Sequence, residues 1–294
     1  GNVGLELTDT NGAQKGANAI SNIRQMLDLW NGEIISDFTY NNAAVSVRTV
    51  SDASGSQIST SVSSHLLSNG EVKLNLRFPY PSGGHTDDSS DWNNFAAHTS
   101  VIVEKGDSFV VIKRTLDETT YFVKVQWNKP ATITEKAPHY FVITASSGNL
   151  ELTCLFAGEQ PSEALPFYAE AKAASKVFWN NYWKSGGAID FLECSDPRAK
   201  ELERRVILSQ YIMRSNNTGE IPPPETGLVY NSWYGRPQLE MHWWHSVHHA
   251  LWGHPELLEK SMGRYKDAAY SPAKSIAARQ GFVVCEIRNN LTIP

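Results

Sequence analysis

A single change in hydrophobic periodicity, near residue 165, divides this chain. Before it, segments such as VKLNLRFPY, SFVVIKRTLD and YFVKVQW alternate apolar and polar side chains, and Asn-Gly, Asp and Ser-Gly turns separate them. A period of two buries one face of each strand and leaves the other in water, as in antiparallel sheets. Many such strands in series predict a large antiparallel β-sandwich over residues 1–163.

After this change the apolar residues recur at the spacing of a helix. Pro166 suits a first helical turn, and Gly186-Gly187 ends the pattern. The apolar positions between them are Phe167, Ala171, Ala174, Phe178 and Tyr182. We therefore expect a helical linker within residues 164–195.

The remaining residues, 196–294, predict helices joined by loops. The predicted helices run from Asp196-Pro197 to about residue 214, from 238 to 252, from Pro255 onward, and from Ser271-Pro272 to about Gly281. Because no strand separates them, this pattern favours stacked helical hairpins over a βαβ arrangement.

Composition excludes several classes of function. A net charge of −5 without basic runs gives no reason to expect a nucleic acid or an anionic membrane surface as partner. No segment reaches the roughly 20 apolar residues of a membrane span. The three cysteines form neither a disulfide framework nor a zinc-finger pattern. We expect no cofactor.

The segment 228–254, LVYNSWYGRPQLEMHWWHSVHHALWGH, carries the strongest chemical signal. It holds five of the nine histidines and four of the nine tryptophans. Imidazole and indole both present a flat ring with a polar edge. Such rings suit a ligand that is flat on one side and hydroxylated around its rim, and a sugar ring is a ligand of this kind.

Three interpretations of this segment compete. On a helix from residue 238, His242, His245 and His249 share one face, whereas Glu240 lies opposite with Trp244. The helix could be buried on all sides, with each ring nitrogen bonded internally. His245 and His249, four residues apart, could bind zinc, although HExxH is absent and no acidic third ligand stands at a familiar spacing. The third interpretation is a sugar site at the junction between loop and helix.

The sugar site would combine ring stacking with hydrogen bonds to adjacent hydroxyls. The free backbone N–H groups of the helix start would add donors for oxygen atoms. The side chains expected to contact substrate are Trp233, Tyr234, Arg236, Glu240, His242 and Trp243. We expect no bound metal.

Two loops offer further candidates. In FPYPSGGHTDDSSDWNN, residues 78–94, Tyr80, His85 and Trp92 could reach the helical domain, or could simply anchor a solvated loop. Glu225, held after three prolines in PPPETG, could bind substrate or remain an exposed loop carboxylate.

The chain resembles six-hairpin glycosidase-like proteins. The resemblance is specific in LERRVILSQYIMRSNNTGEIPPPETGLVYNSWYGRPQLEMHWWHSVHHALWGHPELLEKSM. It is fair in MLDLWNGEIISDFTY, LRFPYPSGGHTDDSSDWNN and FWNNYWKSGGAIDF. The wider group includes maltose and kojibiose phosphorylases, glucoamylases and trehalases. It implies a β super-sandwich, a helical linker and an (α/α)6 barrel, and a periplasmic or secreted location.

The resemblance also implies where the site lies. The helix at 238–252 would be the first inner barrel helix, with Trp233, Tyr234, Arg236, Glu240 and His242 lining the −1 sugar subsite. Glu240 would stand about where phosphorylases place an aspartate that holds sugar hydroxyls. About four of the twelve barrel helices fit before Pro294, so we expect an incomplete barrel, a sandwich lacking N-terminal strands, and a general acid encoded beyond Pro294.

The function implied is an inverting glycoside hydrolase acting on an oligosaccharide or polysaccharide. One carboxylic acid protonates the leaving oxygen and a second carboxylate activates water, about 6.5–9.5 Å away. Glu240 and Glu225 are the carboxylates to test here, and we expect binding roles for both. The alternatives are a non-catalytic carbohydrate-binding protein or inactive fragment, a polysaccharide lyase, for which Arg236 is the lone basic candidate, and a zinc hydrolase.

Overall fold

The computed structural model describes residues 1–282 with the exception of 54, 129 and 229. Residues from Val283 onward lie outside the described part of the chain. Contacts divide the chain into two units, Gly1–Ser185 and a second that begins at Gly186. The finer division into 1–163, 164–195 and 196–294 stays a prediction.

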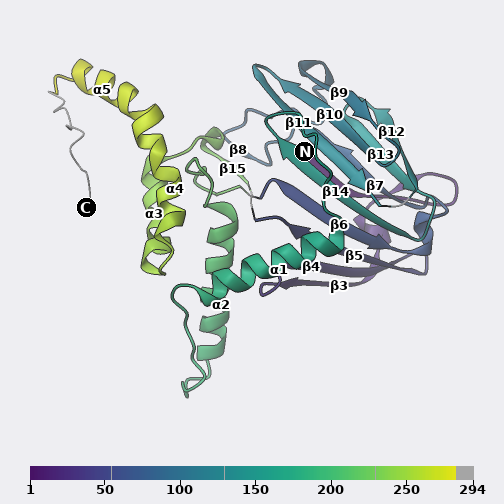
Figure 1. Cartoon of the computed structure of the whole chain (residues 1–294), viewed down its shortest axis with the longest axis horizontal. Coiled ribbons are helices and arrows are strands. Elements are labelled where there is room, and N and C mark those ends of the chain that lie inside the picture. The colour runs from purple at the N-terminus through teal and green to yellow at the C-terminus, as the bar shows by residue number, and fades with distance from the viewer. Residues whose placement is uncertain (54, 129, 229, 283–294) are drawn as a thin grey trace. The chain divides into compact units, whose positions relative to one another are not determined.

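The first unit contains two antiparallel sheets (Figure 1). The five-stranded sheet has the order β12 (Ala131–Ala137), β13 (Tyr140–Ala145), β7 (Val72–Arg77), β1 (Asn2–Thr8), β2 (Gln14–Lys15). The eight-stranded sheet has the order β3 (Ser21–Asp28), β4 (Glu33–Tyr40), β5 (Ala43–Ser51), β6 (Gln57–Ser63), β14 (Asn149–Ala157), β11 (Thr119–Trp127), β10 (Phe109–Leu116), β9 (His98–Lys105). The antiparallel sheets expected from the period-two pattern are therefore confirmed.

One hydrophobic core holds this unit together. In β7, Val72, Leu74 and Leu76 are buried at alternate positions, as the sequence pattern requires. Large aromatic side chains, including Trp127 and Phe141, join the same core. The short elements of the unit are β8 (Thr86–Asp87), η1 (Ala17–Ala19), η2 (His65–Leu67) and η3 (Phe95–Ala97).

Helix α1 (Tyr168–Lys184) packs on the eight-stranded sheet against β5, β6 and β14. The turn before β4 fixes its position, because Ser175 Oγ donates to the carbonyl of Asn31 at 3.0 Å. Gly32, at φ +64°, lies so close to Trp179 that a Cβ atom would stand 2.0 Å from the indole ring. Only glycine fits both this backbone conformation and this contact.

The second unit is helical. Its helices are α2 (Ala199–Asn216), α3 (Leu239–Leu251), α4 (Pro255–Arg264) and α5 (Tyr270–Arg279), with β15 (Asn231–Ser232) and the 3-10 turn η4 (Trp233–Gly235) before α3. The β-then-helix organisation predicted from sequence is confirmed. Whether these helices begin an (α/α)6 barrel stays a prediction. None of the helices within the described part of the chain is long and apolar enough to cross a membrane.

One helix boundary differs from the expectation. Ser271-Pro272 was expected to open a separate helix, but a π-helical segment, Tyr265–Ala269, joins α4 directly to α5. Pro272 is the third residue of α5, directly after the π-helical segment, where the backbone hydrogen-bonding pattern changes. Proline therefore marks a change in helical hydrogen bonding at this point rather than a new start.

Candidate functional site

The loop between α2 and α3 is closed by its prolines. Pro224 and Pro237 form an antiparallel bridge, so the two ends of this stretch lie side by side. Gly227, at φ +69°, donates its N–H to the carbonyl of Pro224 at 2.9 Å and makes the turn. Thr226 hydrogen-bonds through its hydroxyl to the carbonyl of Tyr230. These contacts therefore fix the backbone path of residues 231–237, which lead into α3.

Trp233 and Tyr234 occupy an unusual backbone conformation at the surface. Their φ angles are +49° and +61°, a left-handed region that costs non-glycine residues about 1–3 kcal/mol each. Their side chains are 52% and 55% exposed. The Arg236 guanidinium lies 5.5 Å from the centre of the Tyr234 ring. A strained turn thus presents two aromatic rings and a cation together.

The first turns of α3 continue this surface. Glu240 is exposed in the first turn, where the helix dipole favours a carboxylate. Trp243 lies three residues later and is 64% exposed. We call Trp233, Tyr234, Arg236, Glu240 and Trp243 the junction cluster. Its members combine stacking surfaces with charged hydrogen-bonding groups.

His242, the sixth side chain expected in this site, lies elsewhere. It is 3% exposed. Its Nδ1 lies 2.9 Å from the hydroxyl of Tyr265, and its Nε2 lies 2.7 Å from that of Ser261. Both ring nitrogens are therefore used between α3 and the helical segment after it, which differs from the sugar contact expected from sequence.

The other imidazoles of α3 are also turned inward. Burial lowers the pKa of His245 and of His248. Burial is also the main cause that lowers the pKa of His249 to about 3, with His248, Arg214 and His254 adding to it. Two interactions with Glu225, a backbone hydrogen bond and its charge, raise the pKa of His245 and so oppose the effect of burial. Glu225 therefore lies beside α3. These histidines are neutral near pH 7.

Three buried polar atoms on this inward face make no hydrogen bond to the part of the chain that the structure describes. They are His245 Nδ1, Ser246 Oγ and His249 Nε2. The described residues contain no group of three or more His, Cys, Asp or Glu side chains placed to hold a metal ion. His245 and His249 therefore lack a third protein ligand there.

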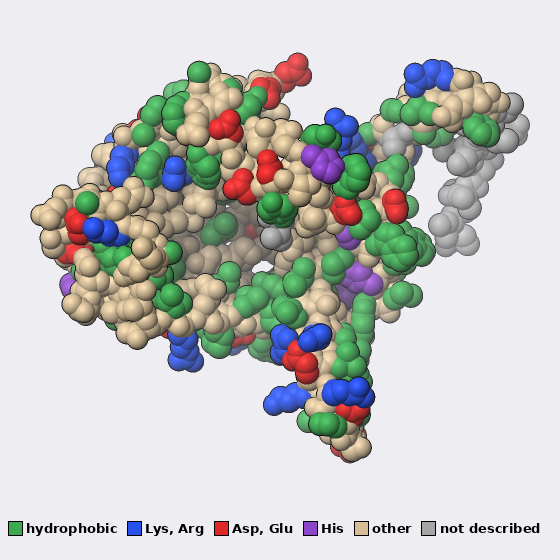
Figure 2. All heavy atoms as spheres, turned by 180° about the vertical axis from the view of Figure 1, so that it is seen from behind, with side chains coloured by type: hydrophobic (Ala, Val, Ile, Leu, Met, Phe, Trp, Pro, Cys, Tyr) green, Lys and Arg blue, Asp and Glu red, His purple; other side chains and the backbone are tan. Residues whose placement is uncertain are grey.

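A groove between α2 and α3 adds aromatic residues that the sequence analysis omitted. Its volume is about 370 Å³, and Trp244, His248 and Trp252 line its α3 side. Gln210 and Arg205 contribute from α2. The i, i+4, i+8 spacing of the three ring residues could have identified this face. Figure 2 shows hydrophobic side chains gathered near histidines in this unit.

The second predicted cluster is ordered within the first unit. The Tyr80 hydroxyl donates to Asp117 Oδ1 at 2.7 Å. The Arg77 guanidinium lies 4.4 Å from the Trp92 ring centre. His85 is exposed, with its Nδ1 3.0 Å from the hydroxyl of Thr86. The predicted reach of Tyr80, His85 and Trp92 towards the helical domain stays a prediction.

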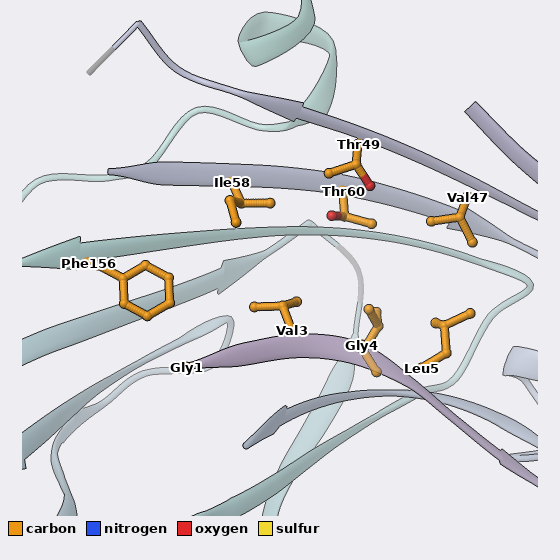
Figure 3. Close-up of a pocket in the computed structure, with 10 residues that line it drawn as sticks. Gly1, Val3, Gly4, Leu5, Val47, Thr49, Ile58, Thr60 and Phe156 are labelled. Atoms are coloured by element: carbon orange, nitrogen blue, oxygen red, sulfur yellow. The ribbon is translucent and has the colours of Figure 1, made fainter. Parts of the chain in front are cut away.

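The sandwich encloses a different kind of space. A cavity of about 230 Å³ lies between the two sheets, and Figure 3 shows the side chains that line it. Its lining is mainly aliphatic and aromatic, with Val3 and Leu5 from β1 facing Val47, Ile58 and Phe156. Such a lining offers few hydrogen bonds to a hydroxylated ligand, so it is unsuited to a sugar.

Comparison with known proteins indicates the fold. No family model matches the chain, and no curated protein matches it. A search of solved structures finds "Putative kojibiose phosphorylase from human microbiome", with a TM-score of 0.50 and 12% sequence identity. The match covers 76% of this chain and 32% of that chain, so this chain spans about a third of that protein's length. At this identity the likeness is one of fold, and it agrees coarsely with the group that the sequence resembles.

Proposed function

We propose that the junction cluster binds a carbohydrate. In this proposal Trp233 and Trp243 stack on the C–H faces of sugar rings. Arg236 and Glu240 bond adjacent hydroxyls, and Tyr234 supports Arg236. His242 has a positioning role, because it holds α3 against Ser261 and Tyr265.

One observation carries this proposal. The strained turn exposes Trp233 and Tyr234 at 52% and 55%, and Trp243, in the first turns of the helix that follows, is 64% exposed. Left-handed backbone at two consecutive aromatic residues opposes folding, and such strain clusters at ligand-binding and active sites. Exposed aromatic rings next to charged hydrogen-bonding groups have the chemistry that recognises a sugar.

We further propose that this site belongs to an inverting glycoside hydrolase acting on an oligosaccharide or polysaccharide. In it, Glu240 and Glu225 would bind sugar rather than transfer protons. Two carboxyl groups about 6.5–9.5 Å apart would bracket the bond and the attacking water. The glycosidase-like fold of the solved neighbour supports a carbohydrate-related function only in this general sense.

Calorimetric titration of the chain with a panel of neutral oligosaccharides tests the binding proposal. We expect saturable binding of at least one of them, and a loss of affinity of about tenfold or more in Trp233→Ala and Trp243→Ala, since aromatic stacking contributes on the order of 1–2 kcal/mol. Trp30→Ala is the matched control, because Trp30 is an exposed indole (47%) in the other unit.

An activity assay on the same panel separates an enzyme from a binding protein. We expect binding without turnover from this chain. Turnover would contradict the expectation that the carboxylates of this site, Glu240 and Glu225, only bind sugar. Absence of binding to every oligosaccharide would contradict the site itself.

A further inference from the structure

Strand β3 is an edge strand that carries apolar side chains on both faces. It ends the eight-stranded sheet, with β4 as its neighbour on one side. Seven of its eight residues are exposed. Met26 and Leu27, which are adjacent in the regular part of the strand and so lie on opposite faces, are 44% and 37% exposed. An edge of this length and composition is a template for pairing with another strand.

The exposed apolar surface of β3 continues onto β4, the other strand of this hairpin. Leu27 pairs with Ile34 of β4, and these residues are 37% and 41% exposed. From Arg24 to Asp28 the pairing with β4 is continuous, since the irregularity lies between Ser21 and Arg24. A regular stretch of five residues is therefore available for pairing on the free side of β3.

We propose that β3 pairs antiparallel with β3 of a second copy of this chain. The charged residues of the strand favour one register, in which a two-fold axis relates the two copies. With Met26 opposite Met26 of the second copy, Arg24 stands opposite Asp28, and Asp28 opposite Arg24. Both cross-strand pairs then join unlike charges on the face that carries Met26, which stabilises antiparallel strands. The self-complementary pattern makes a second copy the occupant that fits this edge.

The pairing joins the two eight-stranded sheets into one continuous sheet. Asp28 already accepts hydrogen bonds from the backbone of Trp30 and Asn31 in the turn after β3. A further hydrogen bond from the Asn31 side-chain amide reaches its Oδ2 at 2.5 Å. These bonds fix the carboxylate at the end of the strand, so its remaining lone pairs can accept from the Arg24 guanidinium of the other copy at low cost in side-chain entropy.

A cysteine cross-link tests this register in the full chain. Directly opposite residues in antiparallel strands have Cα atoms about 4.5–5.5 Å apart, within the range of a disulfide. We expect Met26→Cys, with Cys194 and Cys285 replaced by serine, to form a covalent dimer on oxidation by oxidised glutathione. Gln25→Cys is the control, since the two introduced thiols would be diagonal across the strands, about 7–8 Å apart.

A charge reversal tests the strand pairing independently of the cross-link. Arg24→Asp places a carboxylate opposite Asp28 in each of the two cross-strand pairs and should raise the dimer dissociation constant at least about tenfold, measured by sedimentation. Lys105→Asp makes the same charge change on β9, at the other edge of the sheet, and should leave the dimer intact. A wild-type chain that remains monomeric at about 100 μM, or equal cross-linking by both cysteine variants, would overturn the proposal.

Discussion

The two units of this protein distribute apolar and polar residues in opposite ways. The sandwich buries large side chains, including Trp127, Phe141 and Tyr40, each at 2% exposure or less. Among the described residues of the helical unit, the buried apolar side chains are Ala199, Pro222 and Pro223, while the polar His242, Ser246 and His249 are also buried. Trp243, Trp244 and Leu251 of the same unit are 64%, 64% and 81% exposed.

The sandwich is therefore a stable scaffold, whereas the helical unit exposes a surface that a ligand can contact. Burial of a large apolar side chain stabilises a fold by about 1.5–3 kcal/mol. Many large apolar side chains of the sandwich each contribute a stabilisation of this size. The helical unit relies on hydrogen bonds such as those of His242 and leaves its indoles in water. Its exposed rings are therefore available for a ligand, which is the basis of the proposed sugar site.

The largest expected effect is the loss of an aromatic ring from the sandwich core. Phe141→Ala should lower the free energy of unfolding by about 3–5 kcal/mol, because the ring is fully buried. Trp244→Ala should change it by about 0.5 kcal/mol or less, because that ring is exposed. Urea unfolding of both variants measures the contrast. Equal destabilisation would show that the helical unit has a core of its own.

Acid should destabilise the chain through its buried imidazoles. Burial lowers the pKa of His98 in the sandwich to about 4 and of His249 in the helical unit to about 3, from the ordinary 6.5. The unfolded chain therefore binds more protons below pH 6.5. Stability is fully present above this pH and falls as the pH drops towards the folded values, by about 2 kcal/mol per group between pH 7.5 and 4.5.

His249→Gln should weaken this pH dependence in the helical unit. Helix content followed by circular dichroism during acid titration gives the measurement. His85→Gln serves as the control for removing an exposed imidazole. An unchanged acid transition in His249→Gln would mean that this buried ring does not couple stability to pH.

His242 and Trp243 should separate stability from binding within two consecutive residues. His242→Ala removes one hydrogen bond from each of the Ser261 and Tyr265 hydroxyls, although Ser261 keeps its bond to the carbonyl of Leu258, and should cost about 1–2 kcal/mol. Hydrogen exchange in α4 should accelerate in this variant. Trp243→Ala should lose sugar affinity while exchange in α4 stays as in the wild type. Acceleration by both changes would contradict the division of roles.

The smallest effect concerns the strained turn. Tyr234 has φ +61°, so Tyr234→Gly removes a steric cost and should change stability by no more than about +1 kcal/mol, since glycine also has greater freedom when unfolded. The melting temperature measures this gain. A clear loss of stability would show that the tyrosine ring, through its contact with Arg236, contributes more than its backbone costs.

Sequence patterns predicted where helices and strands lie along the chain, but not which of them pair or pack together. Alternation and helical spacing depend on neighbouring residues, so a helix predicted at 238–252 is observed as Leu239–Leu251. Strand order, such as β14 beside β6, depends on contacts between distant residues, and no local pattern contains it. The same limit explains why Pro272 predicted a separate helix where the structure has a π-helical join.

The sequence likewise predicted only part of the candidate site. Angular spacing showed that His242 and His249 share one face of α3, opposite Glu240. Which face is buried depends on Ser261 and Tyr265, whose hydroxyls meet His242 from a later segment. Indoles usually bury more readily than imidazoles, so composition alone did not indicate that His242 would be buried while Trp243 is exposed.

The most direct test of the account is a spectrum of the indole N–H groups during titration with an oligosaccharide that the chain binds. The account predicts that the signals of Trp233 and Trp243 shift with one shared dissociation constant, while the buried Trp127 does not move. A titration in which the shifts belong to other tryptophans, with Trp233 and Trp243 unaffected, would contradict the proposed sugar site.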